Sequence, residues 1–210
     1  MKMDVRRFSV STNGKSALKA ATAIALSLHI AGCAHTMAYL SGPGVTDENP
    51  GNRTVGMVVE DANIETKITG NLYKADKRFR DRPIKVASYN GIVLLAGNVA
   101  DDTMSNTAIS IAKKMRGVRN VQSELQIGPA PSWHSTGNDA WVQSKIKTIM
   151  YSTRDFPASR IKVVTESGIV YLMGLVTEQE ANEAVEIIKD ISGIRRIVKI
   201  FEYIPANNTL

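Results

Sequence analysis

Apolar and polar positions follow one order along the chain and then repeat it. Each copy opens with apolar residues four positions apart, which is the spacing of one face of an α-helix. These residues are Ile64, Ile68 and Leu72 in the first copy, and Val142, Ile146 and Met150 in the second. The copies are offset by 78 residues at Asp61 and Asp139, and by 76 residues at Gly117 and Gly193. A repeat of this length indicates a duplicated domain, because solenoid units have about 20–50 residues.

A β-hairpin is predicted after the first helix of each copy. Its strands are expected at residues 84–87 and 92–96 in the first copy, and at 160–164 and 169–173 in the second. Asn90-Gly91 separates the first pair of strands, and Ser167-Gly168 separates the second pair. Asn-Gly is a strong signal for a two-residue hairpin turn, so both copies are expected to reverse direction at these positions.

Four glycines are assigned structural roles, which we favour over the cradling of a ligand. Gly91 and Gly168 lie in the expected hairpin turns. Gly97 and Gly174 end the second strands, where a side chain would collide with the next helix or where a positive φ is needed.

A second helix and a last strand complete each copy. Asp101 or Asp102 stands where a helix N-cap is wanted, and Thr177 with Glu180 forms a capping-box sequence in the second copy. The last strands are expected at residues 118–127 and 194–203. The resulting order is αββαβ, and the predicted class is α+β with two helices covering one face of each three-stranded sheet.

Composition divides the chain into six segments. We expect a signal peptide at 1–32, a flexible tether at 33–56, a first domain at 57–127, a linker at 128–137, a second domain at 138–204 and a tail at 205–210. The tether and linker are rich in Gly, Pro, Asn, Ser and Thr and lack apolar periodicity. The linker also carries Trp133, which favours docking of the two domains over free swinging.

The first 32 residues have the order of a secretory signal. Basic residues precede an apolar stretch at 20–30, which is too short to span a bilayer, and small residues follow it. Ile30-Ala31-Gly32-Cys33 resembles the bacterial lipobox, which implies that Cys33 is lipidated and begins the mature chain. The alternative is a plain secretory signal with an incidental cysteine. Ala34 after the cysteine resembles lipoproteins that are sent to the outer membrane.

Charge and reactive residues narrow the function. The net charge of +6 falls to +2 without the signal, which holds five basic side chains and one acidic one, so a nucleic-acid partner is not expected. The three histidines, His29, His35 and His134, all lie outside the repeats, and Cys33 is the single cysteine. No nucleophilic triad, histidine-based metal site or nucleotide-binding glycine pattern can be assembled in either domain. We expect neither an enzyme nor a cofactor.

The two glycine-rich blocks resemble BON domains. Each reads Gly-Ile-Val-x-Leu-x-Gly-x-Val, at residues 91–99 and 168–176, and each is followed by a Gly-(Val/Ile)-Arg-x-(Val/Ile) block. The likeness covers roughly residues 50–204. Two such domains behind a lipobox resemble outer-membrane lipoproteins that face the periplasm of Gram-negative bacteria. This resemblance implies binding of anionic phospholipid through the first helix of the second domain, and a role in outer-membrane integrity.

The pattern of that helix supports a membrane-binding face. On a helical wheel the apolar residues that include Val142 and Ile146 point about 125° away from Trp141. The candidate membrane-binding residues are Trp141, Lys145, Thr148 and Tyr151. An exposed Trp beside a Lys and near a Tyr is typical of a bilayer interface. Tyr151 departs from the family pattern, in which an aliphatic residue is typical.

Two alternatives stay open at this point. Trp141 could pack against Trp133 or against the first domain, whose matching position is the polar Asn63. The chain could also be a periplasmic adaptor, in which exposed sheet faces and the Trp141 helix dock an envelope assembly factor or a regulator of cell-wall remodelling. The sequence does not identify such a protein partner.

Overall fold

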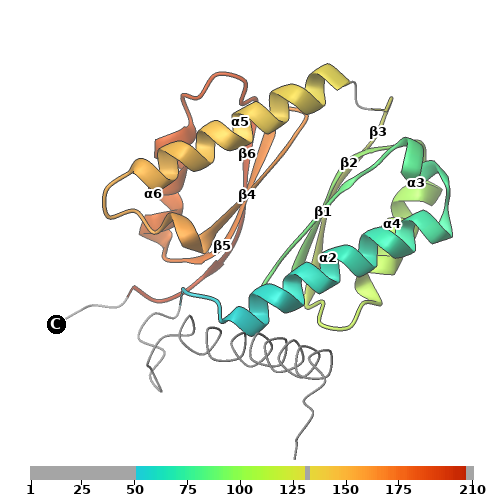
Figure 1. Cartoon of the computed structure of the whole chain (residues 1–210), viewed down its shortest axis with the longest axis horizontal. Coiled ribbons are helices and arrows are strands. Elements are labelled where there is room, and N and C mark those ends of the chain that lie inside the picture. Colours follow the sequence, from blue (N-terminus) through green and yellow to red (C-terminus); the bar gives the residue numbers. More distant parts are fainter. Residues whose placement is uncertain (1–50, 131–132, 207–210) are drawn as a thin grey trace, which may run out of the picture. The chain divides into compact units, whose positions relative to one another are not determined.

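The computed structural model describes residues 51–130 and 133–206, and residues 133–136 in their backbone alone. The expected signal peptide, Cys33 and residues 33–50 of the expected tether lie outside the described residues, as do residues 207–210. None of the described helices is both long and apolar enough to cross a bilayer. Two similar units of helices and strands make up the described part of the chain (Figure 1).

The first unit has the predicted αββαβ order with one short extra helix. Its elements are α2 (Val55–Ala75), α3 (Arg78–Asp81), β1 (Lys85–Tyr89), β2 (Ile92–Val99), α4 (Asp102–Lys113) and β3 (Asn120–Ile127). The sheet order is β1-β2-β3, with β1 and β2 antiparallel and β2 and β3 parallel.

The second unit repeats this topology. Its elements are α5 (Trp133–Ser152), the 3-10 helix η1 (Ala158–Arg160), β4 (Ile161–Glu166), β5 (Ile169–Val176), α6 (Glu178–Ile188) and β6 (Arg196–Tyr203). Strand β5 lies between an antiparallel β4 and a parallel β6. The α+β class and the two tandem copies, each with a three-stranded sheet and two main helices, are therefore confirmed.

Two helices begin earlier than the sequence pattern indicated. Helix α2 begins at Val55, inside the expected tether, because the Thr54 hydroxyl accepts a hydrogen bond from the backbone N–H of Met57 at 3.2 Å and caps the helix. Helix α5 begins at Trp133, inside the expected linker 128–137. Only residues 128–132 then separate β3 from α5.

The predicted helix caps are confirmed. The Asp101 carboxylate accepts a hydrogen bond from the backbone N–H of Met104 at 2.8 Å. Thr177 and Glu180 form both hydrogen bonds of a capping box, at 3.2 and 2.8 Å. These bonds satisfy backbone N–H groups that a helix leaves unpaired at its first turn.

The hairpin turns and strand-end glycines are explained by backbone geometry. Asn90 and Gly91 have φ values of 51° and 73°, and Ser167 and Gly168 have 50° and 72°, so both residues of each turn are left-handed as a type I′ turn requires. Gly97 has a φ of 134°. Gly174 does not, but a Cβ added there would lie 2.6 Å from the carbonyl oxygen of Arg160. The obstacle at Gly174 is therefore the last residue of η1, just before β4, and not the next helix, α6.

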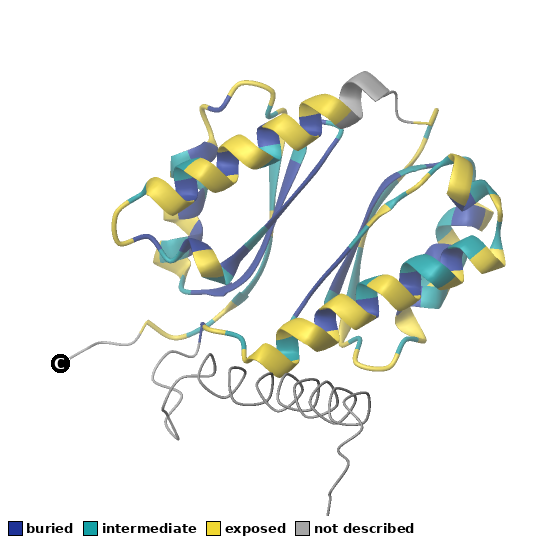
Figure 2. Cartoon of the chain, in the orientation of Figure 1, coloured by how far each residue is buried: buried dark blue, intermediate teal, exposed yellow. Residues whose placement is uncertain are grey.

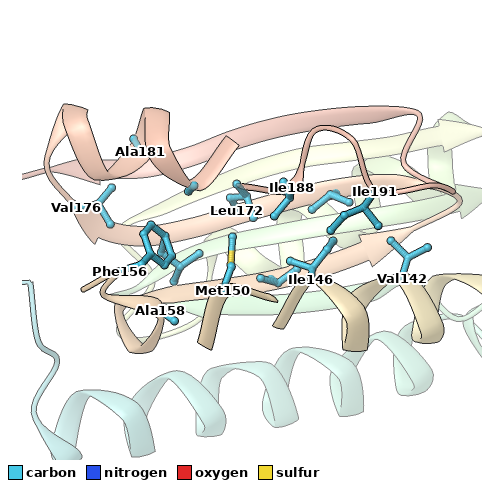
Figure 3. Packing of buried hydrophobic residues seen from close by; sticks show 14 residues of the cluster. Val142, Ile146, Met150, Phe156, Ala158, Leu172, Val176, Ala181, Ile188 and Ile191 are labelled. Atoms are coloured by element: carbon cyan, nitrogen blue, oxygen red, sulfur yellow. The ribbon is translucent and has the colours of Figure 1, made fainter. Parts of the chain in front are cut away.

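Each domain has its own core between its helices and one face of its sheet. In the second domain Val142, Ile146 and Met150 of α5 pack with Leu172 of β5 and Ile188 of α6, and their side chains point toward one another (Figure 3). Residues of α5 change from buried to exposed around the helix (Figure 2). This arrangement confirms the core residues predicted for the first helices.

The second faces of both sheets are buried in one shared cluster. It consists of Ala87, Tyr89, Leu94 and Ala96 from the first domain, and Val164, Tyr171, Met173 and Leu175 from the second. Successive strand residues point to opposite faces, so Leu94 enters this cluster while Val93 and Leu95 enter the helix-covered core. The sheet faces that the adaptor hypothesis treats as exposed are therefore not open, since side chains of the two sheets pack against one another there.

Polar contacts between the domains accompany that cluster. Arg119 pairs with Glu202 at 2.7 Å, and Asn90 donates to the same carboxylate at 2.8 Å. The Tyr89 hydroxyl donates to the carbonyl oxygen of Arg160 at 2.7 Å. Lys162 pairs with Glu65 of α2. Both hairpins and helix α2 therefore contribute to this interface.

Candidate membrane-binding face

The rotation of α5 about its axis is set by its buried side. Val142, Ile146 and Met150 are almost fully buried at successive turns, and Ile149 is partly buried against the same core. Residues at i and i+4 lie on one face of a helix, so these positions turn the opposite face to solvent. The apolar spacing in the sequence thus decides which residues of α5 are exposed.

Asp139 fixes the first turns of α5 to the hairpin of its own domain. Its buried carboxylate accepts hydrogen bonds from the backbone N–H groups of Ser167 and Gly168, at 2.7 and 2.8 Å. One turn later the Gln143 side chain accepts a hydrogen bond from the N–H of Thr165 at 3.2 Å. These bonds fix the helix in rotation and in position along the sheet.

The first domain uses the same device with additional partners. Asp61 accepts hydrogen bonds from the N–H groups of Asn90 and Gly91 at 2.8 and 3.0 Å, and from the Ser88 hydroxyl at 2.6 Å. It also forms an ion pair with Arg53 at 2.7 Å. Burial acts to raise the pKa of Asp61, but these hydrogen bonds outweigh it and hold the pKa below its usual value.

The four predicted membrane-binding residues are exposed on α5. Trp141 is 53% exposed and Tyr151 is 67% exposed, while Lys145 and Thr148 are also exposed. The Lys145 ammonium lies 4.9 Å from the centroid of the Trp141 ring, which is a cation–π distance. The Thr148 hydroxyl donates to the carbonyl oxygen of Ser144 at 3.0 Å. At about 1.5 Å per residue the face extends about 15 Å from Trp141 to Tyr151.

The exposure of Trp141 bears on the packing alternatives. A ring with half its surface open is not sealed beneath the first domain. The side chain of Trp133, the other proposed packing partner, lies outside the described residues. The role of the four residues in membrane binding stays a prediction.

Helices α5 and α2 both expose lysines, but they differ in exposed carboxylates. Lys145 and Lys147 are exposed on α5, whose only carboxylate, Asp139, is buried in the hairpin contact. Helix α2 exposes Glu60 together with Lys67 and Lys74, and the position that matches Trp141 is the exposed Asn63. The equivalent helices therefore differ at the position of Trp141 and in Glu60, an exposed carboxylate that α5 lacks.

The buried carboxylates of the described residues are found at the hairpins. No group of three or more His, Cys, Asp or Glu residues within them could hold a metal ion. Glu166 is buried beside the second hairpin, and burial raises its pKa. Asp61, Asp139 and Glu166 all lie at the hairpins, where the two aspartates serve the structural contacts described above.

Comparisons with known proteins agree with this architecture. The model of the BON domain matches residues 60–129 and 138–205, which contain the two αββαβ units. The chain is 34% identical over 152 residues to outer membrane lipoprotein DolP of Haemophilus influenzae, covering 72% of this chain and 79% of that protein. It is 28% identical over 152 residues to a 21 kDa hemolysin of Actinobacillus pleuropneumoniae, covering 72% and 78% of the two chains. It is 27% identical over 161 residues to osmotically-inducible protein Y of Escherichia coli, covering 72% and 80%. With both repeats matched along their length, the chain belongs to the BON domain family and carries two tandem copies of that domain.

Proposed function

We propose that this protein is an outer-membrane lipoprotein that binds anionic phospholipid through α5 and supports outer-membrane integrity. The anchor would be Cys33, and the two domains would face the periplasm. The lipobox-like sequence before Cys33 and the likeness to a protein named outer membrane lipoprotein DolP support the location. The exposed Trp141 with its neighbouring lysine supports the binding of lipid.

The exposed Trp141 ring is the observation on which the proposal depends. Inserting an indole into a bilayer interface contributes on the order of 2–3 kcal/mol. Lys145 and Lys147 would each add about 1 kcal/mol near an anionic surface. The sum is a weak affinity for a free domain. A lipid anchor on the same chain raises the effective concentration of bilayer, so weak contacts suffice to hold α5 against it.

Co-sedimentation with lipid vesicles tests the proposal. The unlipidated chain of residues 34–210, which keeps every residue that the structure describes, should bind phosphatidylglycerol vesicles and not phosphatidylcholine vesicles. Trp141→Glu should abolish binding, because a carboxylate in place of the indole opposes insertion. Asn63→Glu, at the matching position of α2, is the control and should bind as the parent chain does. Equal binding by the two variants would refute the proposal.

The adaptor hypothesis is the alternative outcome of the same assay. That hypothesis assigned docking to exposed sheet faces and to the Trp141 helix. The sheet faces are buried in the shared cluster. Of these two docking surfaces, the exposed face of α5 is the one that a protein partner could still contact. Vesicle binding that is absent from the parent chain, or unchanged by Trp141→Glu, would favour such an adaptor over the lipid-binding protein.

A further inference from the structure

A cavity of about 370 Å³ lies beside the C-terminal half of α5. Three cationic side chains line it: Arg53, Lys147 and Lys162. The hydroxyl-bearing residues Tyr151 and Ser159 complete its polar lining, and apolar side chains such as that of Met150 form the rest. No carboxylate belongs to the lining, so an anionic ligand would meet donors without meeting a like charge.

Two of the three cations, Arg53 and Lys162, are positioned by ion pairs with carboxylates of α2. The Arg53 guanidinium pairs with Asp61 at 2.7 Å and lies 3.7 Å from the centroid of the Tyr89 ring, and its side chain is largely buried. Lys162 pairs with Glu65 and is about one-third exposed. Preoriented, partly buried cations lose little entropy on binding an anion and are screened less by salt than surface lysines are.

Lys147 differs from these two cations. It is exposed, and among residues 51–130 and 133–206 no carboxylate forms an ion pair with it. Since Asp61 and Glu65 offset the charges of Arg53 and Lys162, the site carries a surplus of one positive charge. That surplus matches the single negative charge of a phosphodiester better than the two charges of a phosphomonoester.

We propose that this cavity binds the phosphodiester of an anionic glycerophospholipid headgroup, with Lys147 as its unpaired cation and Arg53 and Lys162 as preoriented donors. The inference rests on the proposed binding of α5 to lipid and adds a second, headgroup-specific contact to it. Tyr151 belongs to both sites, since it ends the exposed face of α5 and lines the cavity. A hydroxyl at that position gives the phosphate a donor that an aliphatic residue would lack.

Arg53 also joins the site to the segment that leads from the expected anchor. It precedes α2, and Gly51 beside it is buried against the Arg160 side chain of the second domain. A headgroup in the cavity would therefore contact the second domain and the end of that segment together. Lipid binding would therefore hold both the second domain and the segment that contains Arg53 at the bilayer.

Titration with a soluble headgroup separates this site from insertion of Trp141. The probe is glycerophosphoglycerol, added to the unlipidated chain 34–210 and followed by amide chemical shifts in NMR spectra. Saturable binding is expected, with shifts at Lys147, Tyr151 and Ser159. Lys147→Glu should weaken it at least tenfold, which corresponds to about 1.4 kcal/mol. Lys113→Glu makes the same charge change at an exposed lysine of α4 that does not line the cavity, and it should leave the affinity within about twofold.

A second variant tests the hydroxyl without changing charge or fold. Tyr151→Phe should weaken the probe about threefold, the effect of one hydrogen bond. Absence of saturable binding, or equal losses from Lys147→Glu and Lys113→Glu, would overturn the site. Inorganic phosphate that binds as tightly as glycerophosphoglycerol would overturn the assignment to lipid. Trp141→Glu should still bind the probe while losing vesicles, so failure of the headgroup site and failure of the α5 face give different results.

Discussion

The buried Asp139 carboxylate accepts a hydrogen bond from the backbone N–H of Gly168 at 2.8 Å, which ties the helix that carries Trp141 to the hairpin of its own sheet. Asp61 and Gly91 repeat this contact in the first domain at 3.0 Å. The duplicated bond shows that the position of the first helix on the sheet depends on more than apolar packing.

Asp139→Ala should destabilise the second domain by about 2–4 kcal/mol. The change leaves the N–H groups of Ser167 and Gly168 without their partner, and an unsatisfied buried group costs about 1–3 kcal/mol. Urea unfolding followed by circular dichroism measures the loss. Glu183→Ala, which removes an exposed carboxylate from α6, is the control and should change stability by less than about 0.5 kcal/mol. A similar effect of the two substitutions would contradict the role assigned to Asp139.

Asp61 should make the protein lose stability in acid. Its pKa is lower in the folded state than in the unfolded state, so the unfolded chain takes up the proton first. The stabilisation is complete above the unfolded pKa of about 3.9 and is lost as the pH falls through the folded pKa. We expect the difference in unfolding free energy between the parent chain and Asp61→Asn to shrink between pH 6 and pH 2.5. A constant difference over that range would show that the carboxylate charge is not what the hydrogen bonds stabilise.

Glu166 should have the opposite pH dependence. Burial raises its pKa in the folded state, although Lys85 opposes this, so ionisation of the buried carboxyl opposes folding at neutral pH. Its contribution favours the folded state in acid and is lost as the pH rises through the raised pKa. Glu166→Gln should therefore raise the melting temperature at pH 7 and have little effect at pH 4. Thermal melts at the two pH values measure this, and an equal effect at both would contradict it.

Gly174→Ala should be strongly destabilising, whereas Gly70→Ala should not. The new methyl at 174 would meet the Arg160 carbonyl oxygen at 2.6 Å, and such overpacking costs about 1–3 kcal/mol. Nothing lies within 4 Å of a Cβ added at Gly70 in α2, where alanine should stabilise the helix by about 0.5–1 kcal/mol. Chemical unfolding of both variants gives the comparison. Equal stability of the two proteins would mean that the backbone before β4 can move aside.

Lys145→Gln should weaken binding to phosphatidylglycerol vesicles about fivefold and reduce its dependence on salt. The lysine lies over the Trp141 ring at the proposed interface, and one cation near an anionic surface contributes about 1 kcal/mol. Co-sedimentation at low and at high salt measures both effects. Lys113→Gln, on α4 of the first domain, is the matched control. If it weakens binding as much as Lys145→Gln, general charge and not the α5 face governs the affinity.

Local patterns in the sequence were sufficient to predict the fold. The spacing of Val142, Ile146 and Met150 identified the buried side of α5, and therefore also the exposure of Trp141. The Asn90-Gly91 turn, the capping box and the repeat itself gave the αββαβ order. These features depend on residues a few positions apart, where periodicity and turn chemistry are informative.

The contacts that sequence analysis missed join residues far apart in the chain. Asp139 and Gly168 are separated by 29 positions, and the sign of their contact was an aspartate at the same place in both copies. The sequence also contained a signal for the shared cluster. Strands β2 and β5 are apolar at nearly every position, which is typical of strands that are buried on both faces. No sequence pattern indicated the role of Arg53. A single arginine in a Gly- and Asn-rich segment does not predict its ion pair with Asp61 or the cavity that it lines.

The shared cluster also bears on how this gene could have arisen and how it can be cut. Either half produced alone would present Leu94 and Tyr89, or Tyr171 and Met173, to water on a bare sheet. Such an exposed apolar patch favours self-association. A single-domain ancestor would therefore have formed a homodimer through this sheet face before gene duplication and fusion placed both domains in one chain. Truncated proteins made for experiments should contain both domains, because one domain alone would expose an apolar surface that is buried in the intact protein.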